Sequence, residues 1–306
     1  MANKYYMAAV IFVLSVTMLL GQTAAGFAKA SKKNTKGSQR KSLSIQPARK
    51  VPQKLVLRSA VVLVEDQQTG ELLIQKQATA VTPIASITKL MAAMVVLDAK
   101  MDLQETLTIE VGDKDTLRHS RSRLPVGTKL KRGDALLLAL MSSDNRCAHA
   151  LGRTYPGGFN ACIAAMNAKA RSLGLSETHF EEVAGLSKDN VSSARDLARL
   201  VDSAYRYRLI REFTTCKKVV VHAGGRTVQF SNTNHLVQNR QWQIGLSKTG
   251  YIDEAGRCLV MQARVARRPV LIVLLDSQGK LTRVGDANRI KQWLEGPSTL
   301  QRMRRG

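Results

Sequence analysis

Ser86 and Lys89 lie three positions apart at the start of a long apolar segment, in the sequence Pro83-Ile-Ala-Ser-Ile-Thr-Lys-Leu-Met. Residues three apart share one face of a helix, so the hydroxyl and the amine are expected to be neighbours. A serine hydroxyl becomes a nucleophile when a base removes its proton, and lysine can be that base if burial or a second cation lowers its pKa. The pair therefore indicates nucleophilic catalysis without histidine, and it requires another positive group elsewhere in the chain.

The segment from Pro83 to Lys100 predicts the central helix of the domain. Its positions after Lys89 are apolar as far as Leu97, without the polar face of a helix that borders solvent. Roughly one Ser-x-x-Lys match is expected by chance in a chain of this length, and Ser38 and Lys41 form such a match. That second pair lies in a charged, serine-rich segment with no helix to bury it, so Ser86 is the better candidate nucleophile.

Two further short motifs contain groups that could complete a site. Ser143-Asp144-Asn145 lies between two expected helices, where Ser, Asp and Asn also serve as ordinary N-caps. Lys248-Thr249-Gly250, followed by Tyr251, ends an apolar run and taken alone is typical of a strand entering a loop. Lys248 would supply the second cation that Lys89 requires.

The ordered set Ser-x-x-Lys, Ser-x-Asn and Lys-Thr-Gly resembles the penicillin-recognising serine acyl-transferase superfamily, which includes penicillin-binding proteins and serine β-lactamases. In that family the three motifs line one cleft. The resemblance implies catalytic roles for Ser86, Lys89 and Ser143, and substrate-binding roles for Asn145, Lys248, Thr249, Gly250 and Tyr251.

These implied roles divide the reaction among separate groups. Ser86 would be the acylated nucleophile, Lys89 its base, and Ser143 the relay of a proton to the leaving amine. Asn145 would hold the substrate amide, while Lys248 and Thr249 would bind a terminal carboxylate. The backbone N–H groups of Ser86 and Tyr251 would form the oxyanion hole.

Further segments make the resemblance closer. They look like the D-alanyl-D-alanine endopeptidases of the penicillin-binding protein 7 type from about Leu57 to Gly296: Leu138-Ala-Leu-Met-Ser-Ser-Asp-Asn, Tyr155-Pro-Gly-Gly, Met166-Asn-Ala-Lys-Ala, Gly185-Leu-Ser and Asn232-Thr-Asn-His-Leu. The resemblance implies hydrolysis of D-Ala-containing cross-links between peptidoglycan stem peptides, inhibition by β-lactams, and no metal or organic cofactor.

Three alternatives remain open. A D-Ala-D-Ala carboxypeptidase would share the motifs, because spacing does not show which leaving group the cleft admits. A class A β-lactamase would need a Glu-x-x-Leu-Asn loop, and the segment Phe180-Glu-Glu-Val-Ala-Gly-Leu-Ser lacks that pattern. Without a dedicated base, a penicilloyl enzyme should persist. A non-enzymatic binder of acidic wall polymers is disfavoured because the motif residues are intact.

The N-terminal sequence predicts export. Residues 1–30 contain Lys4, an apolar run from Met7 to Leu20 and small residues ending at Ala30, as in a cleaved signal peptide. A membrane anchor is the alternative, but the run is shorter than the ~20 residues needed to span a bilayer. The short sequence after Gly296 leaves no room for a second β-domain or an amphipathic anchoring helix. We expect a periplasmic enzyme.

The net charge of +24 is concentrated at the ends, since no acidic residue precedes Glu65. Residues 31–54 are expected to be a basic flexible linker and residues 297–306 a basic tail. We do not expect nucleic acid as a partner of an exported protein. Such a protein meets anionic wall or membrane surfaces instead, and weak contact with these surfaces is left open.

The cysteines and histidines form no metal-binding pattern such as Cys-x-x-Cys or His-Glu-x-x-His. Cys147 and Cys162 lie on two expected helices that flank the turn 155–158, so a disulfide between them is left open. Cys216 and Cys258 have no evident partner, and Cys258 is expected to be buried in a strand.

The remaining pattern predicts an α/β protein of the α+β type. Strands are expected near both ends of residues 55–296, at 57–65, 71–75, 219–221, 227–230, 243–247, 258–265 and 269–275. Helices are expected between them at 133–141, 146–154, 159–173 and 194–205, with a last helix at 283–294. The prediction is one β-lactamase/transpeptidase-like domain, with an antiparallel sheet from both chain ends and a helical insertion. Charged side chains before the second motif are expected to be solvated: Arg118, Arg121, Arg123 and Lys129.

Overall fold

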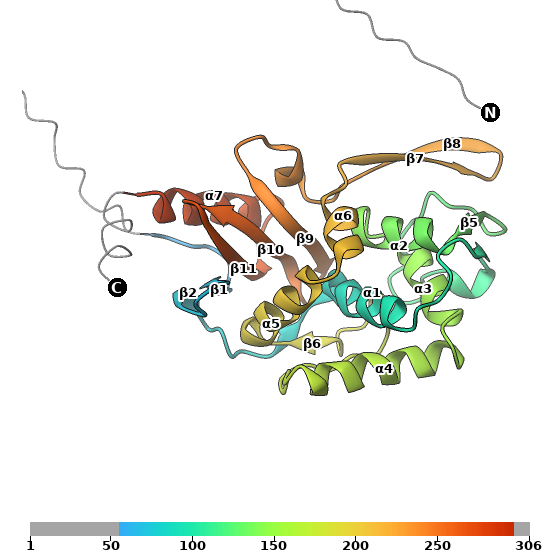
Figure 1. Ribbon diagram of the computed structural model, residues 1–306, viewed down its shortest axis with the longest axis horizontal. Helices are drawn as coiled ribbons and strands as arrows, with labels where there is room; N and C mark the ends of the chain where they lie inside the picture. Colours follow the sequence, from blue (N-terminus) through green and yellow to red (C-terminus); the bar gives the residue numbers. More distant parts are fainter. Residues whose placement is uncertain (1–54, 297–306) are drawn as a thin grey trace, which may run out of the picture. The chain divides into compact units, whose positions relative to one another are not determined.

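The computed structural model describes residues 55–296, and Figure 1 shows how their elements are arranged. The expected signal peptide (1–30), linker (31–54) and basic tail (297–306) lie outside the described residues. The described part contains a five-stranded sheet, three two-stranded pairs and a series of helices. The predicted α+β class is confirmed.

The five-stranded sheet is antiparallel throughout and has the order β2-β1-β11-β10-β9. Its strands are β1 (Val61–Asp66), β2 (Leu72–Lys76), β9 (Gln243–Ile252), β10 (Gly256–Val265) and β11 (Arg268–Ser277). Two strands come from the beginning of the described chain and three from its end, as the sequence predicts. β9 lies at one edge of the sheet and carries the Lys248-Thr249-Gly250 motif.

Both faces of the sheet are covered, which explains why its central strands are apolar rather than alternating. On one face Val62 and Ile272 pack with Ile290 of α7 (Thr282–Leu294). On the other face Leu63 belongs to the same buried cluster as Leu197 of α5 (Ala194–Tyr205). The sheet is therefore a rigid central layer between helices (Figure 1).

The helical insertion is built around α1 (Lys89–Asp98), whose residues from Leu90 to Val96 are all buried. Helices α2 to α6 all contact it. Besides α5, these are α2 (Arg132–Met141), α3 (Asn145–Arg153), α4 (Gly158–Ser172) and α6 (Arg208–Thr215). The prediction of a central buried helix is confirmed. In residues 55–296 no helix combines the length and apolarity that crossing a membrane requires.

Short elements connect these layers. The small strand pairs are β3 (Thr82–Pro83) with β6 (Val191–Ser192), β4 (Thr106–Thr108) with β5 (Lys129–Lys131), and β7 (Lys218–Ala223) with β8 (Arg226–Ser231). The 3-10 turns are η1 (Ala85–Thr88), η2 (Val111–Asp113) and η3 (His235–Gln238). The hairpin β7–β8 projects beyond the helices in Figure 1.

The sequence prediction needs three corrections. The strands expected at 219–221 and 227–230 form the separate hairpin β7–β8 and do not join the predicted single sheet. The strand expected at 243–247 continues to Ile252, because Lys248 and Thr249 pair with Val260 and Leu259 of β10. The third motif therefore lies within a strand, not in a loop at its end. Helix α6 was not predicted, since only two residues separate it from α5 and its Ile210 and Thr214 are its only buried side chains.

Two of the arginines that were expected to be solvated, Arg118 and Arg123, make contacts within the protein. Arg118 is not simply solvated: it forms an ion pair with Glu254 at 2.8 Å and donates to the Leu186 carbonyl. Arg123 lies 4.2 Å from the ring centroid of Phe230.

All four cysteines are free thiols, so the disulfide left open between Cys147 and Cys162 is not formed.

Asp286 of α7 joins the two ends of the described chain. Its carboxylate is fully buried and accepts hydrogen bonds from the backbone N–H groups of Arg58 and Ser59 and from the Ser59 hydroxyl. Burial alone would raise the pKa of Asp286, but the hydrogen bonds from Ser59, Arg58 and Arg289 outweigh it, and the pKa is lowered. The charged form of Asp286 therefore stabilises the folded state.

We predict that Asp286→Asn lowers the free energy of unfolding by about 3 kcal/mol at pH 7, because buried donors lose an ionised acceptor. A lowered pKa means that this stabilisation is present above the ordinary aspartate pKa of 3.8 and is lost as the pH falls through the folded-state value. Urea unfolding at several pH values measures both effects. Asp102→Asn, at an exposed position, is the matched control. Equal stability of wild type and Asp286→Asn at pH 7 would contradict the prediction.

Candidate active site

The turn that carries the candidate nucleophile is 3-10 and not α-helical. Ser86 lies within η1, and Lys89 is the first residue of α1. A 3-10 turn has three residues per turn, so the two side chains project from the same side. The Lys89 Nζ donates to the Ser86 Oγ at 2.7 Å, which confirms the expected contact.

Close backbone packing fixes this turn. Ala85 adopts a left-handed φ of 48°, which is unusual for a residue with a Cβ. Gly185 packs against it so tightly that a Cβ there would lie 1.9 Å from the Ala85 carbonyl oxygen. A Cβ on Gly250 would lie 3.1 Å from the Ser86 nitrogen. The turn is thus held between a loop on one side and β9 on the other; the contact at Gly185 requires glycine, and the one at Gly250 leaves a side chain little room.

Lys89 is 1% exposed and satisfied only by neutral oxygens. Besides Ser86, its Nζ donates to the Asn145 Oδ1 at 2.7 Å and to the Ala184 carbonyl at 2.6 Å. Burial lowers the pKa of Lys89 to about 8, although the nearby carboxylates of Glu182, Asp144 and Asp115 act in the opposite direction. A substantial fraction of Lys89 is therefore neutral near pH 8, as a general base must be.

The second motif occupies the junction between α2 and α3. Asp144 is the N-cap of α3, because its carboxylate accepts a hydrogen bond from the Cys147 N–H; the N-cap interpretation is confirmed for this residue. Ser143 has a left-handed φ of 59°, and its hydroxyl accepts from the Lys248 Nζ at 2.8 Å. Asn145 also donates to the Ser120 hydroxyl at 2.7 Å. The same turn thus caps a helix and supplies two side chains to the cleft.

The third motif lies on β9. Lys248 is 1% exposed and donates to Ser143 and to the Thr249 carbonyl. Thr249 donates through its hydroxyl to the Thr233 Oγ at 2.7 Å. The Gly250 carbonyl accepts from Arg283 at 3.0 Å. Three segments far apart in the sequence therefore meet at one place.

Tyr251 has a different position from the other motif residues. Its side chain is 51% exposed, its hydroxyl donates to Asp253, and the Arg257 guanidinium lies 4.4 Å from its ring centroid. The side chain does not join the polar cluster. Of the groups of Tyr251, its backbone N–H is the candidate for the oxyanion hole, together with the N–H of Ser86.

The sequence argument gave burial and the Lys248 charge as the two factors that lower the pKa of Lys89. Burial is the first cause for Lys89. The pKa of Lys248 is itself lowered well below its ordinary value, first by burial and then by the charges of Lys89 and Arg283. Neither lysine forms an ion pair with a carboxylate in residues 55–296, so the resting cleft disfavours two ammonium groups at once.

Several groups at the site were missed by motif reasoning. The Ala184 carbonyl accepts from both Lys89 and Ser86, the latter at 3.2 Å. Thr233 and Ser120 contact motif side chains through their hydroxyls. Gly185-Leu-Ser and Asn232-Thr-Asn were noted only as points of resemblance, and no residue pattern indicated that their loops reach the cleft.

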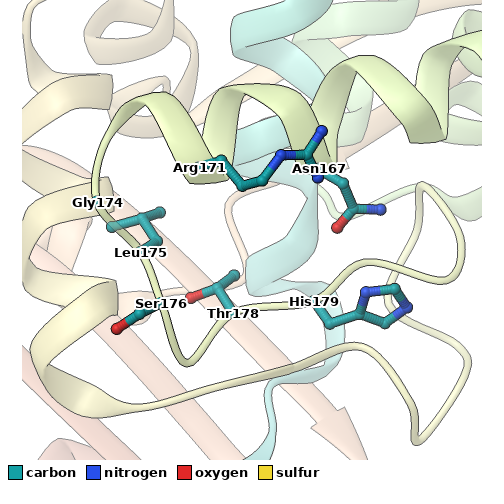
Figure 2. A pocket seen from close by; sticks show the side chains of 7 residues that line it. All are labelled: Asn167, Arg171, Gly174, Leu175, Ser176, Thr178 and His179. Carbon is teal, nitrogen blue, oxygen red and sulfur yellow. The ribbon is translucent and has the colours of Figure 1, made fainter.

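A separate hollow of about 550 Å³ lies beside the C-terminal end of α4. Figure 2 shows its lining, with Arg171 lying along the helix and His179 on the facing segment. Asn167 in its wall uses its amide to hold the backbone of Phe180. None of the motif residues lines this hollow.

Within the described residues, no group of His, Cys, Asp and Glu side chains could hold a metal ion.

Comparison with known proteins gives a consistent result. The family model described as peptidase S11, D-alanyl-D-alanine carboxypeptidase, matches residues 48–279. A D-alanyl-D-alanine endopeptidase of Pseudomonas aeruginosa is 48% identical over 256 residues, which are 83% of each chain. One of the same name from Escherichia coli K12 is 43% identical over 241 residues, which are 78% of each chain.

Solved structures agree with the fold. The DD-transpeptidase of Streptomyces K15 superposes with a TM-score of 0.72 at 28% identity, over 78% of this chain and 97% of the other. A D-alanyl-D-alanine carboxypeptidase of Mycobacterium tuberculosis gives 0.71 at 25% identity, over 81% and 95%. The shared fold, the matching family model and the cluster around Ser86 lead to one conclusion: the chain belongs to the S11 family of serine D-alanyl-D-alanine peptidases.

Proposed function

We propose that this enzyme is a DD-endopeptidase that hydrolyses D-Ala-containing cross-links between peptidoglycan stem peptides through a Ser86 acyl-enzyme. The observation that carries the proposal is the contact between the Ser86 hydroxyl and the buried amine of Lys89. The endopeptidases of Pseudomonas aeruginosa and Escherichia coli, which are 48% and 43% identical to the chain, support the choice of cross-links as substrate. Carboxypeptidase activity on a terminal D-Ala is the second candidate, because other relatives bear that name.

Acylation follows from the geometry. Neutral Lys89 accepts the proton of Ser86 as the Oγ attacks the substrate carbonyl carbon and a C–O bond forms. The oxyanion that develops is stabilised by the backbone N–H groups of Ser86 and Tyr251, and each such donor typically contributes about 3 to 4 kcal/mol. The C–N bond then breaks, and the proton that Lys89 took from Ser86 passes through Ser143 to the departing amine, so that Lys89 is neutral again. Water then attacks the ester carbon and gives a proton to Lys89, and the C–O bond to Ser86 breaks as the Ser86 oxygen takes that proton.

The substrate carboxylate has a physical role in this scheme. Lys248 and Thr249 would bind it, and its negative charge would stabilise the ammonium form of Lys248, which the resting cleft disfavours. A charged Lys248 in turn favours the neutral form of Lys89, because both amines are buried in the same cleft. Substrate binding would thus prepare the base for the reaction.

A β-lactamase function is disfavoured by the loop at 182–190. Its one buried glutamate, Glu182, accepts hydrogen bonds from backbone N–H groups on both carboxylate oxygens. Those oxygens already hold the loop, and the Glu-x-x-Leu-Asn sequence that positions a water-activating glutamate in class A β-lactamases is absent from this segment. We propose that β-lactams acylate Ser86, are released slowly and inhibit the enzyme.

The location is also a proposal, since the segments concerned lie outside the described residues. We propose that residues 1–30 direct export and are removed, that 31–54 form a basic linker, and that 55–296 are the catalytic domain, followed by a basic tail at 297–306. The enzyme would then act in the periplasm, where its basic segments can contact anionic wall or membrane surfaces weakly.

The first prediction concerns the nucleophile. Ser86→Ala should reduce covalent labelling by a fluorescent penicillin by at least roughly a thousandfold, because the acylated oxygen is removed. Labelled protein resolved on a denaturing gel measures this. Ser38→Ala, in the other Ser-x-x-Lys sequence, is the matched control and should label as wild type. Labelling that survives in Ser86→Ala would place the nucleophile elsewhere.

The second prediction concerns pH. Lys89 acts in its neutral form and has a pKa of about 8, so acylation should become faster as the pH rises through that value. Well below it, the rate should fall roughly tenfold per pH unit, because the neutral fraction falls by that factor. Stopped-flow acylation by a chromogenic β-lactam between pH 5.5 and 9.5 tests this. A rate independent of pH across the range is the contrary result.

The third prediction concerns the leaving group. Purified enzyme should convert cross-linked muropeptide dimers into monomers faster than it removes D-Ala from pentapeptide monomers. Chromatography of both digests side by side measures the two rates, with Ser86→Ala as the inactive control. Preferential release of free D-Ala from pentapeptides would instead establish the carboxypeptidase alternative.

A further inference from the structure

The loop at 182–190 is folded around the carboxylate of Glu182, which is 8% exposed. Its Oε2 accepts from the Ala184 N–H at 2.6 Å, and its Oε1 accepts from the Leu186 N–H at 2.7 Å. The Oε1 also accepts from the Asn190 side chain at 2.9 Å. A carboxylate held by several N–H donors fixes the backbone around it, because each charge-assisted bond is shorter and stronger than a neutral one.

Ala184 is the residue of this loop that forms hydrogen bonds with the Ser86 and Lys89 side chains. The N–H of Ala184 is bound to Glu182, and its carbonyl accepts from the Lys89 Nζ at 2.6 Å and the Ser86 Oγ at 3.2 Å. Asn190 adds a second connection by donating to the Thr88 hydroxyl, which in turn donates to the Ala85 carbonyl. The position of the Glu182 carboxylate therefore determines where an acceptor of both Ser86 and Lys89 lies.

Glu182 also contributes charge. Its carboxylate is the first among the nearby charges that raise the pKa of Lys89, ahead of Asp144 and Asp115. His149 of α3 faces it with Nε2 4.0 Å from Oε2, but burial lowers the pKa of His149, so the imidazole is neutral near pH 7. The buried thiol of Cys147 also faces Lys89. The two arginines of α3 are engaged elsewhere, because Arg146 donates to the Leu124 carbonyl and Arg153 pairs with Glu110 and Asp113.

We propose that Glu182 is a positioning residue for acylation, which holds the Ala184 carbonyl against Ser86 and Lys89 and adds the negative charge of its own carboxylate to this site. It does not touch the substrate. The inference rests on the proposed function, because it matters for the reaction only if Lys89 is the base. It assigns the loop glutamate a role different from that of a water-activating base.

The test compares Glu182→Gln, Glu182→Asp and the control Glu181→Gln by the pH dependence of acylation by a chromogenic β-lactam. Glu182→Gln removes the charge and places an NH₂ group among N–H donors. We expect the maximal acylation rate to be lower by roughly 10- to 100-fold. The acidic limb of the pH profile, where the rate falls as Lys89 becomes protonated, should shift to lower pH by about one unit. Glu182→Asp keeps the charge but shortens the side chain, so the rate should fall while the limb stays at the wild-type pH.

Glu181 is the matched control, since its side chain is 62% exposed and its ion pair is with His179. Glu181→Gln should match wild type in both rate and limb. If Glu182→Gln shows an unshifted limb, the proposal is wrong, whether or not the rate falls. If that variant does not fold, Glu182→Asp decides: an unchanged rate, or a limb that moves, overturns the inference. Failure of the wild type itself to be acylated would refute the proposed function instead.

Discussion

Two lysine amines are buried in one cleft, and no carboxylate forms an ion pair with either of them in the described part of the chain. Burial of an ammonium group is costly unless the charge is paired, so the pKa of each lysine falls below its ordinary value. Lys89 bonds to Ser86, the proposed nucleophile, and Lys248 bonds to the Ser143 hydroxyl. The arrangement leaves a substantial fraction of the Lys89 amine neutral near pH 8, and the proposed binding of a substrate carboxylate by Lys248 would supply the negative charge that this pair of amines lacks.

The fold maintains this arrangement because each lysine belongs to a rigid element. Lys89 begins the buried helix α1, while Lys248 lies on β9 and is held in register by pairing with Val260 of β10. Gly185 and Gly250 allow a loop and a strand to reach the Ser86 turn at distances that a side chain would prevent. Since the sheet is assembled from both ends of the domain, residues distant in the sequence converge only after the whole domain has folded.

Much of this could be predicted from the sequence. The apolar run after Lys89 indicated the buried helix, and the three motifs indicated which side chains meet. The extent of β9 was underestimated because Lys248, Thr249 and Gly250 do not resemble strand residues until their pairing with β10 is known. The loop contacts of Ala184 and Glu182 could not be predicted, because they are made largely by backbone groups, which carry no side-chain signature. Burial and the Lys248 charge were both expected to lower the pKa of Lys89, but that burial is the first cause could not be predicted, since burial cannot be quantified without a structure.

The central claim is that the cleft itself perturbs these two amines, and NMR titration of the purified enzyme with ¹³C-labelled lysine measures this directly. The signals can be assigned by their loss in Lys89→Arg and Lys248→Arg. The account predicts that the Lys89 signal titrates near pH 8 and that the Lys248 signal also titrates well below 10.5. Two signals that titrate together with the surface lysines, near 10.5, would contradict it.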